Sequence, residues 1–387
     1  MARLTYYIKR IAKMDLGSMF SRVSSVAKKS GKSKIKIFFD MIWCGFRYGA
    51  GYMDYDIIGF YKLNHEQRDS MLTRGRNDKI VKKLNKKSYW HLFNNKSEFN
   101  RMFSEFIPRD WVYINPKKVR KSKDFYLNEE FVKFKNFIAK YPLFFAKPNN
   151  GQCGKGIEKI DIIALDSFLN KKGIKVDTGF TIPPTANIEY TAEILKNDAG
   201  KLYLARIRAL FKYLFDNKLY LLEEPIRQHP VMNLLNPSSV NTCRIVSIMN
   251  EKDEVTILAS FIRIGNGTAV VDNFNSGGMT AKVDVETGKI IEEAVNKEGK
   301  MFENHPLSGT KIKDYEIPYF QEAKEMVIKA AKLSPNVRYV GWDVAITEKG
   351  PTLVEGNQYP GHDIYQVAEK LDENSMGVWP QFKKAIE

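Results

Sequence analysis

The stretch YVGWDVAITEKGPTLVEGN, residues 339–357, is the most informative segment of this 387-residue chain. β-Branched and apolar residues stand on both sides of a break at residues 348–351, EKGP, where glycine and proline interrupt the pattern. This arrangement is typical of two β-strands joined by a turn. The apolar neighbours on both strands favour a buried hairpin over a solvated edge.

Two carboxylates face each other in this predicted hairpin. If Ile346 faces Thr352 across a loop of five residues, Asp343 lies directly opposite Glu355, and Asn357 points to the same face of the sheet. Facing carboxylates repel each other in an ordinary hairpin. Mg²⁺ takes oxygen ligands and combines one or two carboxylates with substrate phosphates, so it would remove the repulsion. We therefore predict a metal site on these residues; the alternative is a hairpin edge whose acids align by chance.

The length and composition are those of a globular protein with two or three subdomains. Charged residues make up 27% and hydrophobic residues 43% of the sequence. No apolar run is long enough to span a bilayer, and no secretory signal is visible at the N-terminus. The three cysteines, Cys44, Cys153 and Cys243, are far apart and share no metal or redox spacing. We therefore expect a cytoplasmic protein.

The formal net charge of +16 is concentrated near the N-terminus. Residues 1–36 contain ten lysines and arginines but one acid, Asp15, and so carry more than half of the excess. Apolar residues near the start recur at the spacing of one helical face: Leu4, Tyr7, Ile8 and Ile11. A basic amphipathic helix favours an anionic membrane surface, and nucleic acid is the less favoured partner because no nucleic-acid-binding motif accompanies it. The alternative is a mobile arm or a helix docked on the protein.

The pattern along the chain predicts four regions. Residues 1–36 form a basic amphipathic arm that ends in a linker-like segment, SVAKKSGKSK, at residues 25–34. Residues 37–123 are helical and rich in aromatic residues. Residues 124–220 mix helices and strands, and strands outnumber helices over residues 221–387.

A glycine-rich loop between two predicted strands is the second candidate site. The segment LFFAKPNNGQCGKGI, residues 143–157, places Lys147 at the end of a strand and glycines at 151, 154 and 156. Such glycines let backbone N–H groups approach a polyanion, and a lysine can reach a phosphate. The spacing is not that of a Walker A motif, and a strand follows instead of a helix. The alternative is a hairpin turn that merely requires glycine.

Two further strands carry an arginine among apolar residues, Arg244 in NTCRIVSI and Arg263 in ILASFIRIG. An unpaired buried charge is very costly, so each arginine needs an anionic partner. That partner is either a structural acid or the phosphoryl or carboxylate oxygens of a substrate. Another strand, LLEEPI, stops at Pro225 and leaves main-chain groups able to bind a nucleobase edge.

Taken in order, these segments resemble the ATP-grasp superfamily, and more narrowly the sugar-transfer-associated ATP-grasp family, whose members tend to belong to cell-surface polysaccharide biosynthesis. The resemblance covers about residues 37–380 and rests on FAKPNNGQCGKG, EEPIRQHP, SSVNTCRIVS, NFNSGG and GWDVAITEKGPTLVEGN. It implies an α+β ATP-grasp fold, in which two α/β subdomains clasp ATP, with a helical, basic N-terminal region. Residues 124–220 would be the small nucleotide-binding subdomain, and residues 221–387 the large subdomain with the metal site.

The resemblance also implies where the nucleotide binds. Lys147 would hold the ATP phosphates, and the loop from Gly151 to Gly156, with Gln152 and Gly154, would close over them. A second lysine, on an earlier strand, is used by such folds but has no assigned position here. No alternating βαβ pattern precedes Asp124, so the chain departs there from the Rossmann-like N-terminal domain of typical ligases.

The remaining roles follow from the same resemblance. Backbone groups of Glu223 and Ile226 would meet adenine, and Glu224 or a neighbour would meet the ribose. Arg244 and Arg263 would face the transferred phosphoryl group and, with Lys147, form the catalytic set. The ligands of Mg²⁺, or of Mn²⁺ in its place, would be Asp343, Glu355 and Asn357.

The implied activity is an ATP-dependent carboxylate–amine ligation through an acyl phosphate. Its substrates would be small-molecule or glycan-linked carboxylates and amines, and its product a modified cell-surface polysaccharide or precursor. The alternatives are an ATP-grasp sugar kinase and a non-catalytic nucleotide-binding scaffold for glycosyltransferases. The expected location is the cytoplasm, with peripheral attachment at the inner face of the plasma membrane. His362 is a further residue that could line the site.

Overall fold

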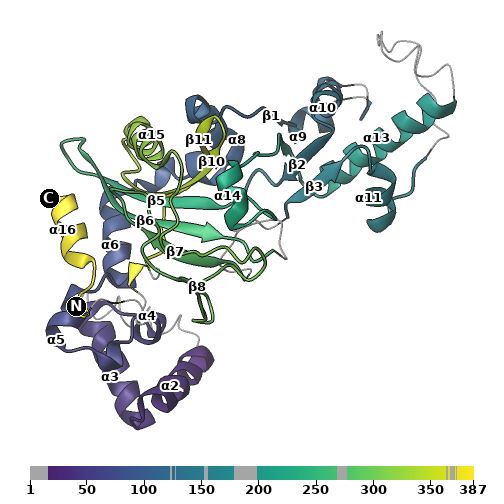
Figure 1. Cartoon of the computed structure of the whole chain (residues 1–387). Helices are drawn as coiled ribbons and strands as arrows, with labels where there is room; N and C mark the ends of the chain where they lie inside the picture. Colours follow the sequence, from purple (N-terminus) through teal and green to yellow (C-terminus); the bar gives the residue numbers. More distant parts are fainter. Residues whose placement is uncertain are drawn as a thin grey trace.

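The structure, a computed structural model, describes residues 16–122, 124–126, 128–151, 156–177, 198–267, 277–362, 365–366, 371 and 373–387. Within this part of the chain, the strands form two antiparallel sheets with helices around them (Figure 1). The α+β architecture predicted from the sequence is confirmed.

The smaller sheet has four strands, in the order β1 (Trp111–Tyr113), β4 (Leu221–Glu223), β2 (Leu143–Lys147) and β3 (Glu158–Asp161). Along β2, Phe144 and Ala146 are buried while their neighbours are half-buried, as expected for a strand with one covered face. Its core is shared with the helices α9 (Pro116–Lys121), α10 (Glu129–Lys140), α11 (Leu165–Lys171) and α13 (Asp198–Asp216).

The larger sheet has seven strands, in the order β11 (Gly350–Asn357), β10 (Tyr339–Thr347), β5 (Thr242–Met249), β6 (Val255–Ile264), β7 (Met279–Val283), β8 (Ala294–Asn296) and β9 (Met301–Phe302). One face packs against α15 (Phe320–Leu333), with Trp342 buried in that core. The short helix α14 (Pro230–Leu235) contributes Met232 to the same core.

The other face of the larger sheet packs against α6 (Arg74–Leu84) and α16 (Trp379–Ile386), which meet it near Tyr339. Side chains alternate between the faces of a strand. Asp343 therefore lies on the side of α6, opposite to Trp342.

The hairpin predicted at residues 339–357 is β10–β11, but its tip is tighter than predicted. Thr347 pairs with Gly350, which leaves a two-residue turn. The predicted pairing of Ile346 with Thr352 is wrong, because Ile346 pairs with Pro351.

An irregularity in β11 nevertheless restores the predicted carboxylate pair. Val344 pairs with Leu353, whereas the next pair is Asp343 with Glu355. Val354 is thus the extra residue of a β-bulge, which shifts the register by one position. The prediction that Asp343 lies opposite Glu355 is confirmed.

Helices precede the first strand. The α-helices are α2 (Leu16–Ser30), α3 (Lys34–Tyr48), α4 (Tyr52–Ile57), α5 (His65–Ser70), α6, α7 (His91–Asn94) and α8 (Lys96–Met102). The 3-10 helices are η1 (Phe60–Lys62), η2 (Lys87–Tyr89) and η3 (Ser104–Phe106). Among the described residues the first strand begins at Trp111, so no βαβ unit precedes it.

The segment at residues 25–34, predicted as a linker, is folded. It completes α2, turns at residues 31–33 and begins α3. Arg22 and Lys29 on α2 form ion pairs of 2.6 and 2.9 Å with the buried Asp56 on α4. The linker prediction is wrong because these contacts and a buried apolar face fix the helix. The predicted apolar stripe at residues 4–11 lies outside the described residues.

Strand pairing crosses the region boundaries predicted at residues 124 and 221. Strand β1 precedes residue 124 yet pairs with β4, and β4 in turn pairs with β2. Both strands therefore belong to the smaller sheet. The predicted boundaries missed this, because pairing between distant segments is not visible in local composition. Across the described helices, none has the length and apolar character that a membrane span requires.

Candidate functional site

Asp343 and Glu355 form a directly opposed carboxyl pair on neighbouring strands. Asp343 is 2% exposed, and Glu355 is half-buried. Desolvation and the neighbouring Asp343 carboxylate raise the pKa of Glu355 above its ordinary value. The two groups are therefore crowded in the way that a bound cation would relieve.

The two arginines predicted from the sequence converge on Asp343. Arg244 donates from Nε and Nη2 to the two carboxylate oxygens at 2.5 and 2.9 Å, and Arg263 donates from Nη1 at 2.7 Å. Burial alone would raise the pKa of Asp343, but the two guanidinium charges outweigh it and lower that pKa. In this structure the anionic partner of both arginines is a protein carboxylate, the structural alternative left open by the sequence.

Asn357 lies at the end of β11, opposite Gly341, and is half-buried. Its Oδ1 accepts a hydrogen bond from the backbone N–H of Tyr359 at 3.0 Å. Within the described residues no group of three or more His, Cys, Asp and Glu side chains could hold a metal ion. Two carboxylates and an amide oxygen nevertheless fit Mg²⁺, since that ion completes its coordination with phosphates and water.

A second cluster surrounds Glu223 in the smaller sheet. Lys147 ends β2 and forms a 2.6 Å ion pair with the buried carboxylate of Glu223, which also accepts a hydrogen bond from Asn100 at 2.8 Å. Burial alone would raise the pKa of Glu223, but the charges of Lys147 and Arg109 hold it far below the ordinary value. Since β4 pairs on both sides, with β1 and β2, Glu223 is fixed at the centre of the sheet.

Lys96 contacts the start of the glycine-rich loop, and the sequence did not indicate it. Its Nζ donates to the backbone oxygen of Gly151 at 2.6 Å, at the start of the glycine-rich loop. Burial lowers the pKa of Lys96, and the remaining electrostatic influences come from Glu355, Lys147 and Glu223. The ammonium group is therefore held at the loop that follows β2. Lys96 begins a short helix of the N-terminal region, and nothing in the local sequence marks it as a ligand-binding residue. Asn95 before it is the N-cap and indicates only where the helix starts.

Arg109 is a second residue that the sequence did not indicate. It is 8% exposed, lies 3.6 Å from Glu223 and donates from Nη1 to the backbone oxygen of Leu353 on β11 at 2.6 Å. Its Nε and Nη2 have no hydrogen-bond acceptor within the described part of the chain. Arg109 thus joins β4 to the β10–β11 hairpin, and two of its nitrogens remain available as hydrogen-bond donors.

The predicted adenine-binding segment links the two sheets. After β4, Glu224 exchanges hydrogen bonds with Asp110: its N–H donates at 3.0 Å, and its carboxylate accepts at 3.2 Å. Ile226 follows and is half-buried. The chain then reaches the hairpin, where the N–H of His229 donates to the oxygen of Ile346 at 2.8 Å. The segment with Glu224 and Ile226 therefore passes from one cluster to the other.

The glycine-rich loop is described at its ends. Gly151 has φ of 154° and Gly156 has φ of 74°, values in the left-handed region that suits glycine. At Gly156 a Cβ would approach Pro148 to 3.2 Å. Gln152 and Gly154 lie outside the described residues, so their predicted contacts remain predictions.

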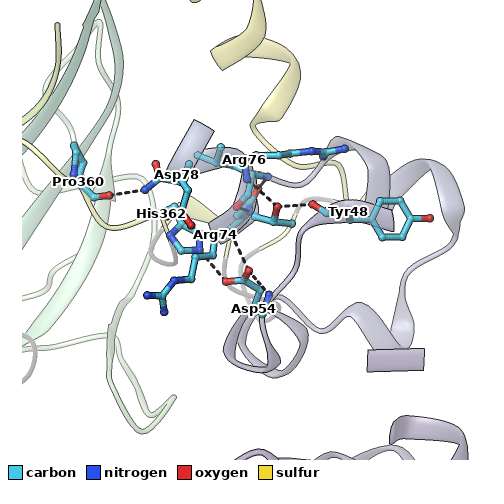
Figure 2. A network of polar contacts seen from close by, with 12 residues as sticks. Tyr48, Asp54, Arg74, Arg76, Asp78, Pro360 and His362 are labelled. Carbon is cyan, nitrogen blue, oxygen red and sulfur yellow. Dashed lines mark hydrogen bonds and ion pairs between the residues drawn. The ribbon is translucent and has the colours of Figure 1, made fainter. Parts of the chain in front are cut away.

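His362 belongs to a polar network that ties the N-terminal helices to the segment after the β10–β11 hairpin (Figure 2). Its Nε2 lies 2.8 Å from Asp54 Oδ1, and Asp54 Oδ2 accepts from the backbone N–H groups of Gly51 and Arg74. Pro360 receives a hydrogen bond from the Asn77 side chain at 3.1 Å. The helical region therefore supports the chain directly beyond Asn357.

Comparisons with solved structures find resemblances of fold at low identity. An ADP complex of N5-carboxyaminoimidazole ribonucleotide synthetase is 10% identical with a TM-score of 0.38, over 76% of this chain and 51% of that chain. D-alanine–D-alanine ligase from Bacillus anthracis is 9% identical with a TM-score of 0.34, over 76% of this chain and 66% of that chain. The chain thus spans about half to two thirds of these proteins. No curated protein matches it.

The family comparison is more specific. The sequence profile of the sugar-transfer-associated ATP-grasp proteins matches residues 75–372, most of the chain. The match includes both clusters, Lys96 and Arg109. The chain therefore belongs to the sugar-transfer-associated ATP-grasp family.

Proposed function

We propose that the protein is an ATP-dependent carboxylate–amine ligase that acts through an acyl phosphate. Its substrates would be a carboxylate and an amine, one of them carried by a cell-surface polysaccharide or its precursor. The single observation that carries this proposal is Arg109, which lies 3.6 Å from Glu223, the partner of Lys147 in the smaller sheet, and donates to the backbone oxygen of Leu353 in the hairpin at 2.6 Å. Phosphates held between these groups would meet cations from one sheet and metal-binding oxygens from the other.

The residues divide the work by their chemistry. Lys147, Lys96 and Arg109 would bind the phosphates of ATP as donors and positive charges. The segment with Glu224 and Ile226 would receive the nucleoside, with backbone groups of Glu223 beside it. The loop from Gly151 to Gly156, including Gln152 and Gly154, would cover the phosphates.

The hairpin would hold the divalent ion. Asp343, Glu355 and Asn357 offer oxygen ligands, and a Mg²⁺ or Mn²⁺ ion there would neutralise phosphate charge and orient the terminal phosphoryl group. Arg244 and Arg263 fix Asp343 and bring positive charge beside the site. Charge that develops on the phosphoryl group during transfer would be stabilised by them.

We also propose the division of the chain into a basic arm, a helical region and two ATP-grasp subdomains, located in the cytoplasm at the inner face of the plasma membrane. The smaller sheet would bind the nucleotide, and the larger sheet the metal. The two alternatives would use the same nucleotide site: a sugar kinase would transfer the phosphoryl group to a sugar hydroxyl, and a scaffold would bind the nucleotide without transfer.

The test is the substrate dependence of ADP formation. Purified protein is incubated with Mg²⁺ and ATP, with panels of carboxylates and amines added singly and together. A ligase forms ADP steadily only when both are present. Steady ADP formation with a sugar hydroxyl and no amine would instead identify a kinase, and nucleotide binding without turnover under any combination would identify a scaffold.

A further inference from the structure

The outer face of α3 is apolar although the helix is already packed through its inner face. Met41 and Cys44 are buried on the inner side. Ile35, Phe39 and Trp43 recur every four residues on the opposite side and are 71%, 64% and 58% exposed. At 100° per residue the two sets lie on opposite faces of the helix. A helix that is apolar on both faces is normally covered on both.

Helix α2 extends this apolar face. Phe20 is 54% exposed and stacks on Phe38 with ring centroids 5.8 Å apart, and Phe38 meets Phe39 edge-on at 5.5 Å. We call Phe20, Ile35, Phe39 and Trp43 the α2–α3 surface. Figure 1 shows both helices at one end of the molecule, away from β2 and β3.

Ion pairs hold this surface rigidly. Besides the contacts of α2 with Asp56, the carboxylate of Asp40 on α3 accepts two hydrogen bonds from Arg68, at 2.9 and 2.8 Å, and one from Tyr55 at 2.6 Å. The surface is thus a fixed part of the folded protein.

Exposed basic side chains lie on the same two helices as the α2–α3 surface. Lys28, Lys34 and Lys36 are exposed, and no carboxylate of the described residues lies within ion-pair distance of them. Arg47 is exposed at the other end of α3. An occupant of the surface therefore meets aromatic groups on helices that also present exposed lysines and an arginine.

We propose that the α2–α3 surface rests on an anionic lipid bilayer. Aromatic side chains at the headgroup level and lysines at the lipid phosphates match this combination of exposed aromatic and basic side chains. A second copy of the chain would bring like charges together. Residues 1–15 would also bring like charges to the surface, because they contain four basic residues and one acid. The proposal does not depend on the reaction, and it assigns membrane contact to folded helices rather than to the first fifteen residues.

The test is co-sedimentation of the full chain with vesicles of equal parts phosphatidylglycerol and phosphatidylcholine, and with phosphatidylcholine alone. The protein should bind the anionic vesicles more strongly. Replacing Phe39 and Trp43 together by Ser should weaken binding on the order of tenfold or more, and Lys34→Gln and Lys36→Gln, which each remove one positive charge, roughly fivefold each. The wild-type chain should show a blue shift of Trp fluorescence on binding that Trp43→Tyr abolishes, a readout independent of the folding of the other variants.

Two controls make the outcome decisive. Ile163, 87% exposed near the smaller sheet, changed to Ser should bind as the wild type does, and so should the chain that begins at residue 16. Absence of vesicle binding, or loss of binding only when residues 1–15 are removed, would overturn the proposal. A change from dimer to monomer in the Phe39→Ser, Trp43→Ser variant, without vesicle binding by the wild type, would show that a second copy covers the surface.

Discussion

Asp343 and Glu355 face each other across β10 and β11. The register at the tip of their hairpin differs by one residue from the register of this pair. The bulge at Val354 corrects the register between the tip and the acids. The two carboxyls meet because of this extra residue. A bulge that aims a side chain is a recurrent device beside functional sites.

Glu355→Gln should abolish ATP turnover and leave the fold intact. The change keeps the volume and removes one hard anionic ligand, so metal affinity falls while packing changes little. It also removes a crowded, half-buried carboxyl, so thermal stability should be unchanged or slightly higher. ADP release and thermal unfolding measure the two effects. Glu348→Gln, on the exposed turn of the same hairpin, is the matched control and should turn over normally. Normal turnover in Glu355→Gln would mean that the hairpin is structural.

Arg263→Ala should reduce turnover far more than nucleotide affinity. Its proposed contribution is greatest when charge develops on the transferred group, and removal of such a donor typically costs about 10²–10³ in rate. The change in kcat, measured from ADP release, is compared with the change in the Kd of ADP between the wild type and Arg263→Ala. Arg206→Ala, which removes an exposed ion pair with Asp166, is the control. An equal loss of affinity and rate would assign Arg263 to ground-state binding.

Lys96→Met should weaken nucleotide binding while the protein remains folded. The side chain contacts the start of the glycine-rich loop, so its removal takes a cation from the place where the phosphates would bind. A rise of about tenfold in the Kd of ATP is expected, measured by calorimetry. The exposed Lys117→Met is the control. An unchanged Kd would place the phosphates elsewhere.

Glu223 should make stability depend on pH in the acid range. Its pKa is lower in the folded protein than in the unfolded chain, so its stabilisation is fully present above the ordinary value of 4.5 and is lost as the pH falls below it. Glu223→Gln should cost about 3–5 kcal/mol at neutral pH, because Lys147 and Arg109 lose their buried counter-charge, and should flatten the acid dependence. Urea unfolding at several pH values measures both. Glu129→Gln, from an exposed pair with Lys118, should change neither, and an equally steep acid dependence in Glu223→Gln would refute this role.

Local patterns were enough to predict the hairpin, the lysine strand and the arginine strands. Each of these signals lies within a few residues: alternation, a glycine cluster, or a charge among apolar neighbours. The register at the hairpin tip was not predictable, since the bulge at Val354 depends on how β11 meets β10.

Lys96 and Arg109 could not be predicted because their partners are distant in sequence. Lys96 contacts Gly151, and Arg109 contacts Glu223 and Leu353. The linker prediction at residues 25–34 failed for the same reason. Its lysines and serines are typical of a linker, but Lys29 pairs with the buried Asp56, a partner that only the folded protein brings near.

Electron paramagnetic resonance of Mn²⁺ in the presence of ADP shows whether a divalent ion and a nucleotide meet at the Asp343–Glu355 pair. The wild-type protein and Glu348→Gln should immobilise Mn²⁺ only when ADP is present, and Glu355→Gln should leave the ion in solution. Equal immobilisation of Mn²⁺ by Glu355→Gln and the wild type would contradict the account.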